Sequence, residues 1–184
     1  KYTAVFNTAG NATTIKGSNG VDTIEGGALT DDTVTLGAGA DVYKYEGGTD
    51  TVTGGAGADH YDIAADGTKA SHLVITDLAS GDQIDLAAIT DNGTAISANL
   101  GDAVTLSSGT AETLDNYLAA AFGANASGTS THVHFQVGGN TYLGVNNTDG
   151  RSGAGYGSGD TLIEITGLVT LKGATNSSEV YTIL

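Results

Sequence analysis

Residues 54–62 read Gly-Gly-Ala-Gly-Ala-Asp-His-Tyr-Asp, and the architecture of the whole chain depends on this nonapeptide. Its glycines permit a sharp turn, an aspartate follows the turn, and an aromatic residue stands two positions later. The same order recurs upstream at nearly equal spacing. Its aspartates are Asp22, Asp32, Asp41, Asp50 and Asp59, and the residues two positions later are Ile24, Val34, Tyr43, Val52 and Tyr61. Such regular repetition predicts a solenoid and disfavours a flexible Gly/Asp-rich linker.

Each repeat is long enough for a turn followed by a short strand, so two repeats complete one coil of a right-handed parallel β-roll. Successive repeats then lie on opposite sheets. We therefore expect Asp22, Asp41 and Asp59 to stack along one edge of the roll, and Asp32 and Asp50 along the other. The apolar residues should sort in the same way, with Ile24, Tyr43 and Tyr61 on one sheet and Val34 and Val52 on the other.

The stacked aspartates predict calcium sites. Carboxylates one strand spacing apart, about 4.8 Å, repel each other unless a cation lies between them. Glycine turns can direct backbone carbonyls at the same point, and an all-oxygen ligand set suits Ca²⁺. The turn residues predicted to contribute are Gly20, Gly37, Gly39, Gly48, Gly55 and Gly57. Two units are irregular: the second has Leu29 and Thr30 where glycine is expected, and the fourth has Glu46.

The composition agrees with a cation-dependent module. Of the 21 acidic residues 16 are aspartate, against 6 lysines and arginines, and the net charge is −15. This charge argues against nucleic acid and anionic membranes as partners. The chain has no cysteine, so a metal ion is the expected substitute for disulfides, and no apolar run is long enough to span a bilayer.

Beyond the repeats the sequence predicts a different kind of β-structure. We expect an all-β protein with the roll over residues 1–66 and a β-rich, sandwich-like region over residues 67–184, packed on the roll. Strands are predicted near residues 71–89, at 161–165 and at 180–184, and a hairpin at 132–137 and 141–145. One short helix is predicted over 110–122, capped by Thr110, with Leu114, Leu118 and Phe122 on its packed face.

Several other polar residues leave alternatives open. Asp77, Asp82 and Asp85 are either an additional calcium site or turn and capping residues. His132 and His134 are expected on the surface, because Val133 and its alternate neighbours should face the core. His60 should point outward from the roll. The chain contains no H-E-x-x-H, G-x-S-x-G or P-loop motif, so we expect no catalytic site.

Residues 16–62 resemble the calcium-binding β-roll of RTX proteins. Residues 74–89, VITDLASGDQIDLAAI, resemble the segment after the roll in type I secreted proteins, including serralysin-like proteases and bacterial surface-layer proteins. Residues 134–147 and 159–171 resemble the tails of surface-layer and adhesin-type members. The resemblance implies a C-terminal secretion signal read by an ABC-type exporter, and folding outside the cell with bound calcium.

These patterns favour a calcium-dependent secretion and surface-assembly module of an exported, surface-layer-like bacterial protein. The alternative is the C-terminal export and stability domain of a secreted hydrolase such as a serralysin-like protease. The ending Val180–Leu184 is less like that of the proteases. A third possibility, a carbohydrate-binding domain, rests only on the expectation that Tyr142 and Tyr156 are exposed. The chain begins at Lys1 and has no methionine, so we read it as part of a longer protein.

Overall fold

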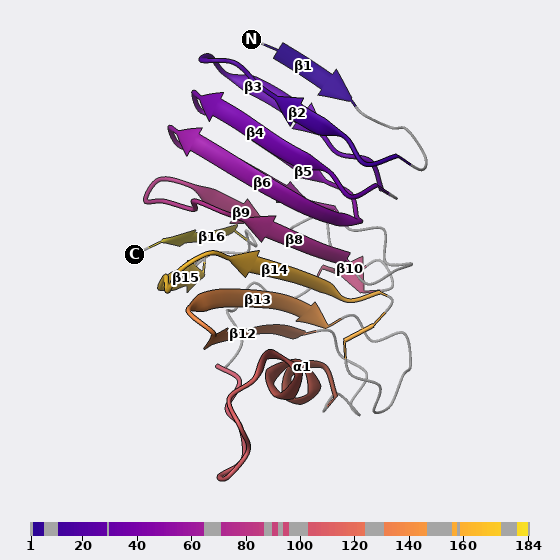
Figure 1. Cartoon of the computed structure of the whole chain (residues 1–184), viewed down its shortest axis with the longest axis vertical. Helices are drawn as coiled ribbons and strands as arrows, with labels where there is room; N and C mark the ends of the chain where they lie inside the picture. Colours follow the sequence, from indigo (N-terminus) through magenta and orange to yellow (C-terminus); the bar gives the residue numbers. More distant parts are fainter. Residues whose placement is uncertain are drawn as a thin grey trace.

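A computed structural model describes residues 2–5, 11–28, 30–64, 71–86, 90–91, 94–95, 103–123, 131–146, 156–157, 159–173 and 180–183. The chain forms two seven-stranded sheets, and the strands of each sheet are stacked along the long axis of the molecule (Figure 1). The first has the order β1 (Tyr2–Val5), β3 (Asp22–Glu25), β5 (Val42–Tyr45), β7 (His60–Ile63), β9 (Gln83–Asp85), β16 (Val180–Ile183), β15 (Leu171–Gly173). The second has the order β12 (Thr131–Val137), β13 (Asn140–Asn146), β14 (Thr161–Ile165), β8 (Ser71–Ile75), β6 (Thr49–Ala56), β4 (Thr33–Ala38), β2 (Thr14–Lys16). The strands β10 (Thr90–Asp91) and β11 (Thr94–Ala95) form a separate antiparallel pair.

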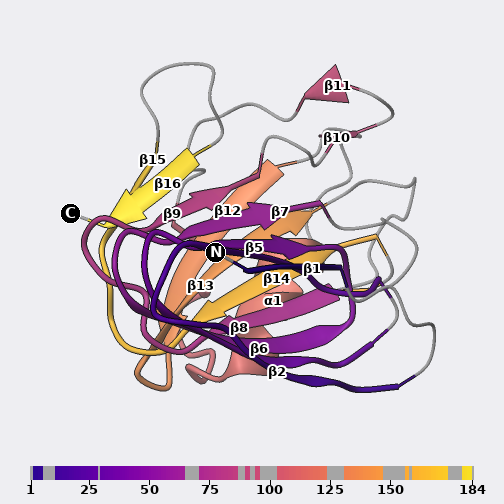
Figure 2. The ribbon, with the colours of Figure 1, turned by 90° about the horizontal axis from the view of Figure 1, so that it is seen from above.

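The N-terminal strands form the predicted parallel β-roll. Consecutive strands alternate between the two sheets, which form opposite walls when the stack is viewed along its axis (Figure 2). On one wall Tyr43 pairs in register with Ile24 and Tyr61, and on the other Val34 pairs with Val52. All five side chains are buried between the walls, and His60 on β7 faces outward, as predicted.

Both sheets continue past the repeats into the C-terminal half. β8 adds to β6 and β9 adds to β7, both in parallel. β14 then pairs in parallel with β8, while β16 adds antiparallel to β9. One apolar core therefore runs from Ile15 and Ile24 in the roll to Ile163 and Tyr181 in the C-terminal strands. The all-β prediction, a roll leading into a sandwich with one short helix, is confirmed.

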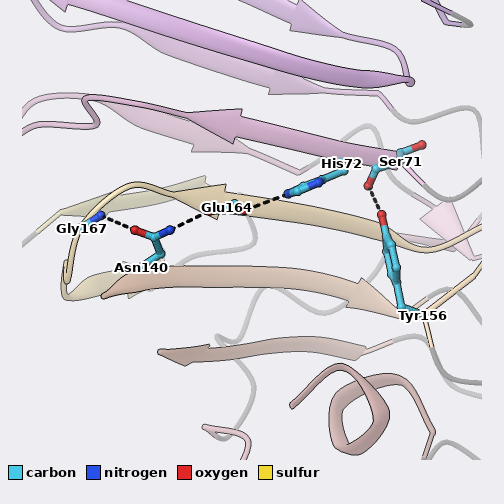
Figure 3. Close-up of polar contacts among 6 residues, drawn as sticks. All are labelled: Ser71, His72, Asn140, Tyr156, Glu164 and Gly167. Atoms are coloured by element: carbon cyan, nitrogen blue, oxygen red, sulfur yellow. Dashed lines mark hydrogen bonds and ion pairs between the residues drawn. The ribbon is translucent and has the colours of Figure 1, made fainter. Parts of the chain in front are cut away.

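Polar contacts join β8 to the C-terminal segments that follow it (Figure 3). The hydroxyl of Tyr156 donates to the carbonyl oxygen of Ser71 at 2.7 Å. Nε2 of His72 on β8 lies 3.2 Å from Oε2 of Glu164 on β14. The other oxygen of Glu164 accepts from Nδ2 of Asn140 at 2.6 Å, so a single glutamate connects three adjacent strands.

The helix α1 (Leu114–Gly123) is shorter at its start than predicted. Its cap is Thr113 and not Thr110, because the Thr113 hydroxyl accepts from the amide of Asn116 at 3.4 Å, while the Thr110 amide is used in a preceding turn. The expected packing face is confirmed. Phe122 is buried and Leu114 and Leu118 are partly buried in a second apolar cluster on the outer face of β12, β13 and β14.

The predicted hairpin is present, but the prediction for its histidines is wrong. Gly138 and Gly139 form the turn with φ values of 63° and 89°. Because α1 covers the face that carries Val133 and Phe135, the opposite face of β12 points between the sheets, and His132 is buried there beside Tyr181. Burial lowers the pKa of His132 to about 4.

The two tyrosines expected on the surface are also placed differently. Tyr142 is buried under Phe135, and Tyr156 is half-buried. The carbohydrate hypothesis therefore loses the residues on which it was based. Leu29 and Leu184 lie outside the described residues. No helix in the described part of the chain is long and apolar enough to cross a membrane.

Candidate metal centre

The predicted aspartates form two buried columns, one along each edge of the roll. The amide of Asp22 donates to Oδ1 of Asp41 at 2.7 Å, and the amide of Asp41 donates to Oδ1 of Asp59 at 2.9 Å. On the opposite edge the amide of Asp32 donates to Oδ1 of Asp50 at 2.8 Å. The predicted sorting of the five aspartates is thus present, and four of the carboxylates accept a backbone amide of the preceding coil, namely those of Asp32, Asp41, Asp50 and Asp59.

The first column has a fourth member that the repeat pattern did not predict. The amide of Asp59 donates to Oδ1 of Asp82 at 2.9 Å, and Asp82 is 3% exposed. Gly81-Asp82 and the buried Ile84 retain the Gly-Asp-x-apolar order of the repeats, which was the available signal. The irregular spacing after Asp59 concealed it. We call Asp22, Asp41, Asp59 and Asp82 the long edge, and Asp32 and Asp50 the short edge.

The second carboxylate oxygens of the short edge have protein donors. Oδ2 of Asp32 accepts from the Thr30 hydroxyl at 2.9 Å. Oδ2 of Asp50 accepts from the Tyr43 hydroxyl at 2.6 Å. Thr30, which is irregular as a repeat residue, therefore serves as a hydrogen-bond donor to the aspartate of its own repeat. Both short-edge carboxylates are hydrogen-bonded through each of their oxygens.

The long edge is different at its centre. At its two ends the Oδ2 atoms accept from backbone amides of their own turns, Asp22 from Ser18 at 2.6 Å and Asp82 from Ala79 at 2.7 Å. Between them, Oδ2 of Asp41 and Oδ2 of Asp59 are both buried without any hydrogen-bond partner. A buried carboxylate oxygen that lacks a donor is costly, so a positive ligand at this position would stabilise the fold.

The turns beside these two aspartates are built from glycines that no other residue could replace. Gly55 and Gly57 have φ values of 98° and 146°. A Cβ atom would lie 1.9 Å from the carbonyl oxygen of Gly37 at the first, and 1.5 Å from that of Gly39 at the second. The turns of adjacent coils are therefore stacked with backbone against backbone, which brings carbonyl groups close to the long edge.

The remaining predicted glycines are less uniform. Gly37, Gly39 and Gly48 also have positive φ. Gly20 lacks a positive φ, and its carbonyl oxygen accepts from the hydroxyl of Ser18 at 3.2 Å. Of the glycines predicted to offer carbonyl oxygens to a cation, those nearest the unpartnered carboxylates are in the turns 37–40 and 55–58.

Asp77, Asp82 and Asp85 do not form a common site. The Asp77 carboxylate accepts from the amides of Gly54 and Gly55 at 2.8 and 2.9 Å, and so caps a turn of the preceding coil. Asp85 lies on the outer face of β9, 3.7 Å from Nε2 of His60. Within the described ranges no group of three or more His, Asp or Glu residues is arranged to hold one ion. Any ion at the long edge must therefore take much of its coordination from backbone carbonyls.

The electrostatics of both edges oppose the accumulation of negative charge. The pKa of Asp59 is raised to about 6, chiefly by burial and also by the nearby charges of Asp82, Asp41 and Asp77, although the amide of Asp41 lowers it. Burial likewise raises the pKa of Asp50 to about 6, although the Tyr43 hydroxyl and the Asp32 amide lower it. In the absence of a cation, the folded state therefore disfavours the ionised form of these carboxylates.

The residues present fit a hard cation at the centre of the long edge.

A scan against protein-family models and a search of curated proteins found no match. Among solved structures the chain is similar to the AlgE6R3 subunit of the mannuronan C5-epimerase from Azotobacter vinelandii, known from a solution structure. The identity is 22%, the match covers 85% of this chain and 72% of that chain, and the TM-score is 0.44. The assignment of a β-roll rests on the strand pairing within this chain.

Proposed function

We propose that this chain is a calcium-folded, non-enzymatic β-roll module of an exported bacterial protein. The observation that carries the proposal is the pair of buried carboxylate oxygens, Oδ2 of Asp41 and Oδ2 of Asp59, for which the fold supplies no donor. A cation of the Ca²⁺ type takes carboxylate and carbonyl oxygens, which are the groups gathered there.

The ion would be held by Asp41 and Asp59 together with carbonyls of the turns 37–40 and 55–58. When bound, it supplies the positive charge that offsets repulsion along the column. The chain's own contribution is positional: the Oδ1 bonds to the next coil orient each carboxylate, and the stacked glycines allow the turns to approach. We expect the short edge to depend less on calcium, because its oxygens are already hydrogen-bonded.

Calcium-dependent folding suits export. A chain that remains unfolded at the low calcium concentration of the cytosol can pass an ABC-type exporter through a signal in its C-terminal region. It then folds outside the cell, where calcium binding to the native state shifts the equilibrium. We place the module at the bacterial cell surface, as the calcium-dependent assembly part of a surface-layer-like protein.

The test compares the chain in chelator and in millimolar calcium. Far-UV circular dichroism should show little β-structure in chelator and a full β signal after calcium is added, with magnesium at the same concentration as the matched control. Isothermal calorimetry on the refolded protein should then detect calcium binding. A full β signal and a sharp melt in chelator would refute calcium-dependent folding.

Assembly is tested separately from folding. Solution scattering of the calcium-loaded chain over a range of protein concentrations should show particles that grow beyond the monomer. A monomer at every concentration would remove the assembly role and leave the calcium-folding role intact.

A further inference from the structure

A groove lies where α1 meets β12 and the segment 169–171. Two cavities of about 310 Å³ and 350 Å³ adjoin there, and both are lined by Val104 and Tyr117. Each volume is near the lower end of the range found for small-ligand sites, about 300–1,000 Å³. The shared tyrosine makes the two cavities consecutive parts of one groove.

Tyr117 is held rigidly at the groove by a column of aromatic rings. Its ring stacks on Phe135 with centroids 5.1 Å apart and 10° between the planes, and Phe135 stacks on Tyr142 at 5.0 Å and 13°. Phe135 and Tyr142 are buried, whereas Tyr117 is only half-buried. Since Phe135 covers one face of the Tyr117 ring, the other face is the one available to a ligand.

The polar groups of the groove are nearly all uncharged. In the first cavity they include the side chains of His134, Gln136 and Thr170. In the second they are the hydroxyl groups of Thr105, Ser107, Ser108 and Thr110. Glu112 is the single acidic residue among the described residues that line the two cavities, and none of these is a lysine or arginine. In a chain of net charge −15, this groove is suited to a neutral ligand.

The segment that contributes Val104 is held to β12 by its backbone. The backbone carbonyl of His134 accepts from the amide of Val104 at 2.9 Å. Because this contact uses only backbone atoms, side chains of both segments remain to line the groove.

We propose that this groove binds a neutral oligosaccharide, with one sugar ring packed on the uncovered face of Tyr117 and the chain running along both cavities. A sugar ring combines an apolar C–H face, which packs on an aromatic ring, with hydroxyl groups that pair with amide, imidazole and hydroxyl side chains. The groove offers both kinds of contact at once. The proposal is independent of calcium binding at the long edge, because no residue of that edge lines either cavity.

The test is a titration of the calcium-loaded chain with neutral oligosaccharides, namely cellohexaose, maltohexaose and mannohexaose, followed by amide chemical shifts. At least one of them should shift the amides of Val104, Tyr117 and Thr170 and leave the roll unchanged. An oligogalacturonate of the same length should bind more weakly, and cyclohexanol serves as an apolar probe. No shift in the groove with any neutral oligosaccharide, or a shift with cyclohexanol alone, would overturn the proposal.

Variants at Tyr117 test whether its ring is the surface on which the sugar packs. Tyr117→Phe keeps the ring and should bind within about twofold of the unmodified chain, while Tyr117→Ala should weaken binding by about tenfold. Thr33→Ala, on the exposed outer face of β4, is the control and should change nothing. If Tyr117→Ala fails to fold, Ser107→Ala and Thr170→Val test the two cavities individually. Unchanged oligosaccharide affinity in a folded Tyr117→Ala chain, or in both Ser107→Ala and Thr170→Val, would contradict the assignment of this groove as the binding site.

Discussion

At the scale of single residues, two aspartates of identical burial and spacing differ in what their second oxygen meets. Oδ2 of Asp50 has the Tyr43 hydroxyl at 2.6 Å, whereas Oδ2 of Asp41 has no donor. The difference arises from the residue seven positions earlier, which is Tyr43 for Asp50 and Val34 for Asp41. We therefore expect the two residues to respond differently to the same substitution.

Asp41→Asn should raise the calcium concentration at the folding midpoint more than Asp50→Asn does. An extracellular-type site with Kd near 10⁻⁴–10⁻³ M contributes about 0.4–1.4 kcal/mol at millimolar calcium, and Asp41 contacts the coils on both sides. Circular dichroism during calcium titration measures the shift. Asp62→Asn, on the outer face of β7, is the control and should leave the midpoint where it is. Equal shifts for Asp41 and Asp62 would exclude a site at the long edge.

The stability of the calcium-free protein should change with pH in the opposite direction to that of the calcium-loaded protein. The folded-state pKa values of Asp50 and Asp59, about 6, lie above the ordinary value of 3.8, so the folded state binds protons first as the pH falls. Their effect is to increase calcium-free stability from about pH 7 to about pH 5. With calcium, protons compete with the ion, and stability should fall over the same range.

The folded fraction of chain freed of calcium by dialysis, followed by far-UV circular dichroism at several pH values, measures this effect. Asp59→Asn cannot titrate at that position, so it should gain less stability on acidification than the unmodified chain. His132 acts in the opposite direction, because its pKa of about 4 lies below the ordinary 6.5 and its contribution is lost as the pH falls between these values. If the unmodified and Asp59→Asn chains respond identically, burial does not raise the pKa of the Asp59 carboxylate in the folded state.

At the scale of elements, Phe122 is the most deeply buried side chain by which α1 packs on the sheet. Phe122 is 5% exposed, and a Cβ on Gly144 of β13 would lie 2.7 Å from its Cζ atom. The glycine thus leaves the space that the ring fills. Leu118, on the same face, is only partly buried.

Phe122→Ala should destabilise the calcium-loaded chain by about 3–5 kcal/mol, and Leu118→Ala by less. Gly144→Ala should also be destabilising, because its new methyl group meets the Phe122 ring, but it should cost little in the Phe122→Ala background. Urea unfolding of the two single variants and the double variant measures this coupling. Additive effects would mean that the ring and the glycine do not share the space described.

At the scale of the whole molecule, the roll and the C-terminal half have continuous sheets and a common core. β8 bonds to β6 on one side and to β14 on the other, and the contacts of Glu164 and Tyr156 reinforce this junction (Figure 3). Loss of the roll would expose one side of β8 and β9. The C-terminal strands should therefore depend on the calcium that stabilises the roll.

Chelation should accordingly unfold both halves in one transition. Far-UV circular dichroism reports the sheets, and amide signals of α1 and β12 report the C-terminal half separately. Both should disappear at the same calcium concentration, with a midpoint in the sub-millimolar to millimolar range. Persistence of the α1 and β12 signals in chelator would show that the C-terminal half folds independently.

Much of the candidate site could be predicted because its information is local. The column to which each of the five repeat aspartates belongs follows from the nonapeptide period alone, since each repeat pairs with the repeat two positions along the chain. Asp82 was not predicted as a column member, because the segment between β7 and β9 interrupts that period while the sheet continues.

The amino-acid sequence by itself determined the parallel roll, the sorting of Asp22, Asp41 and Asp59 from Asp32 and Asp50, and the hairpin around Gly138-Gly139, because turns and alternating apolar residues act over a few positions. Only the tertiary structure decided which carboxylate oxygens lack a donor, and which face of β12 is buried against the first sheet. The burial of His132 depends on a residue far away in the chain, Tyr181, and burial on both faces of a strand removes the alternation from which exposure is predicted.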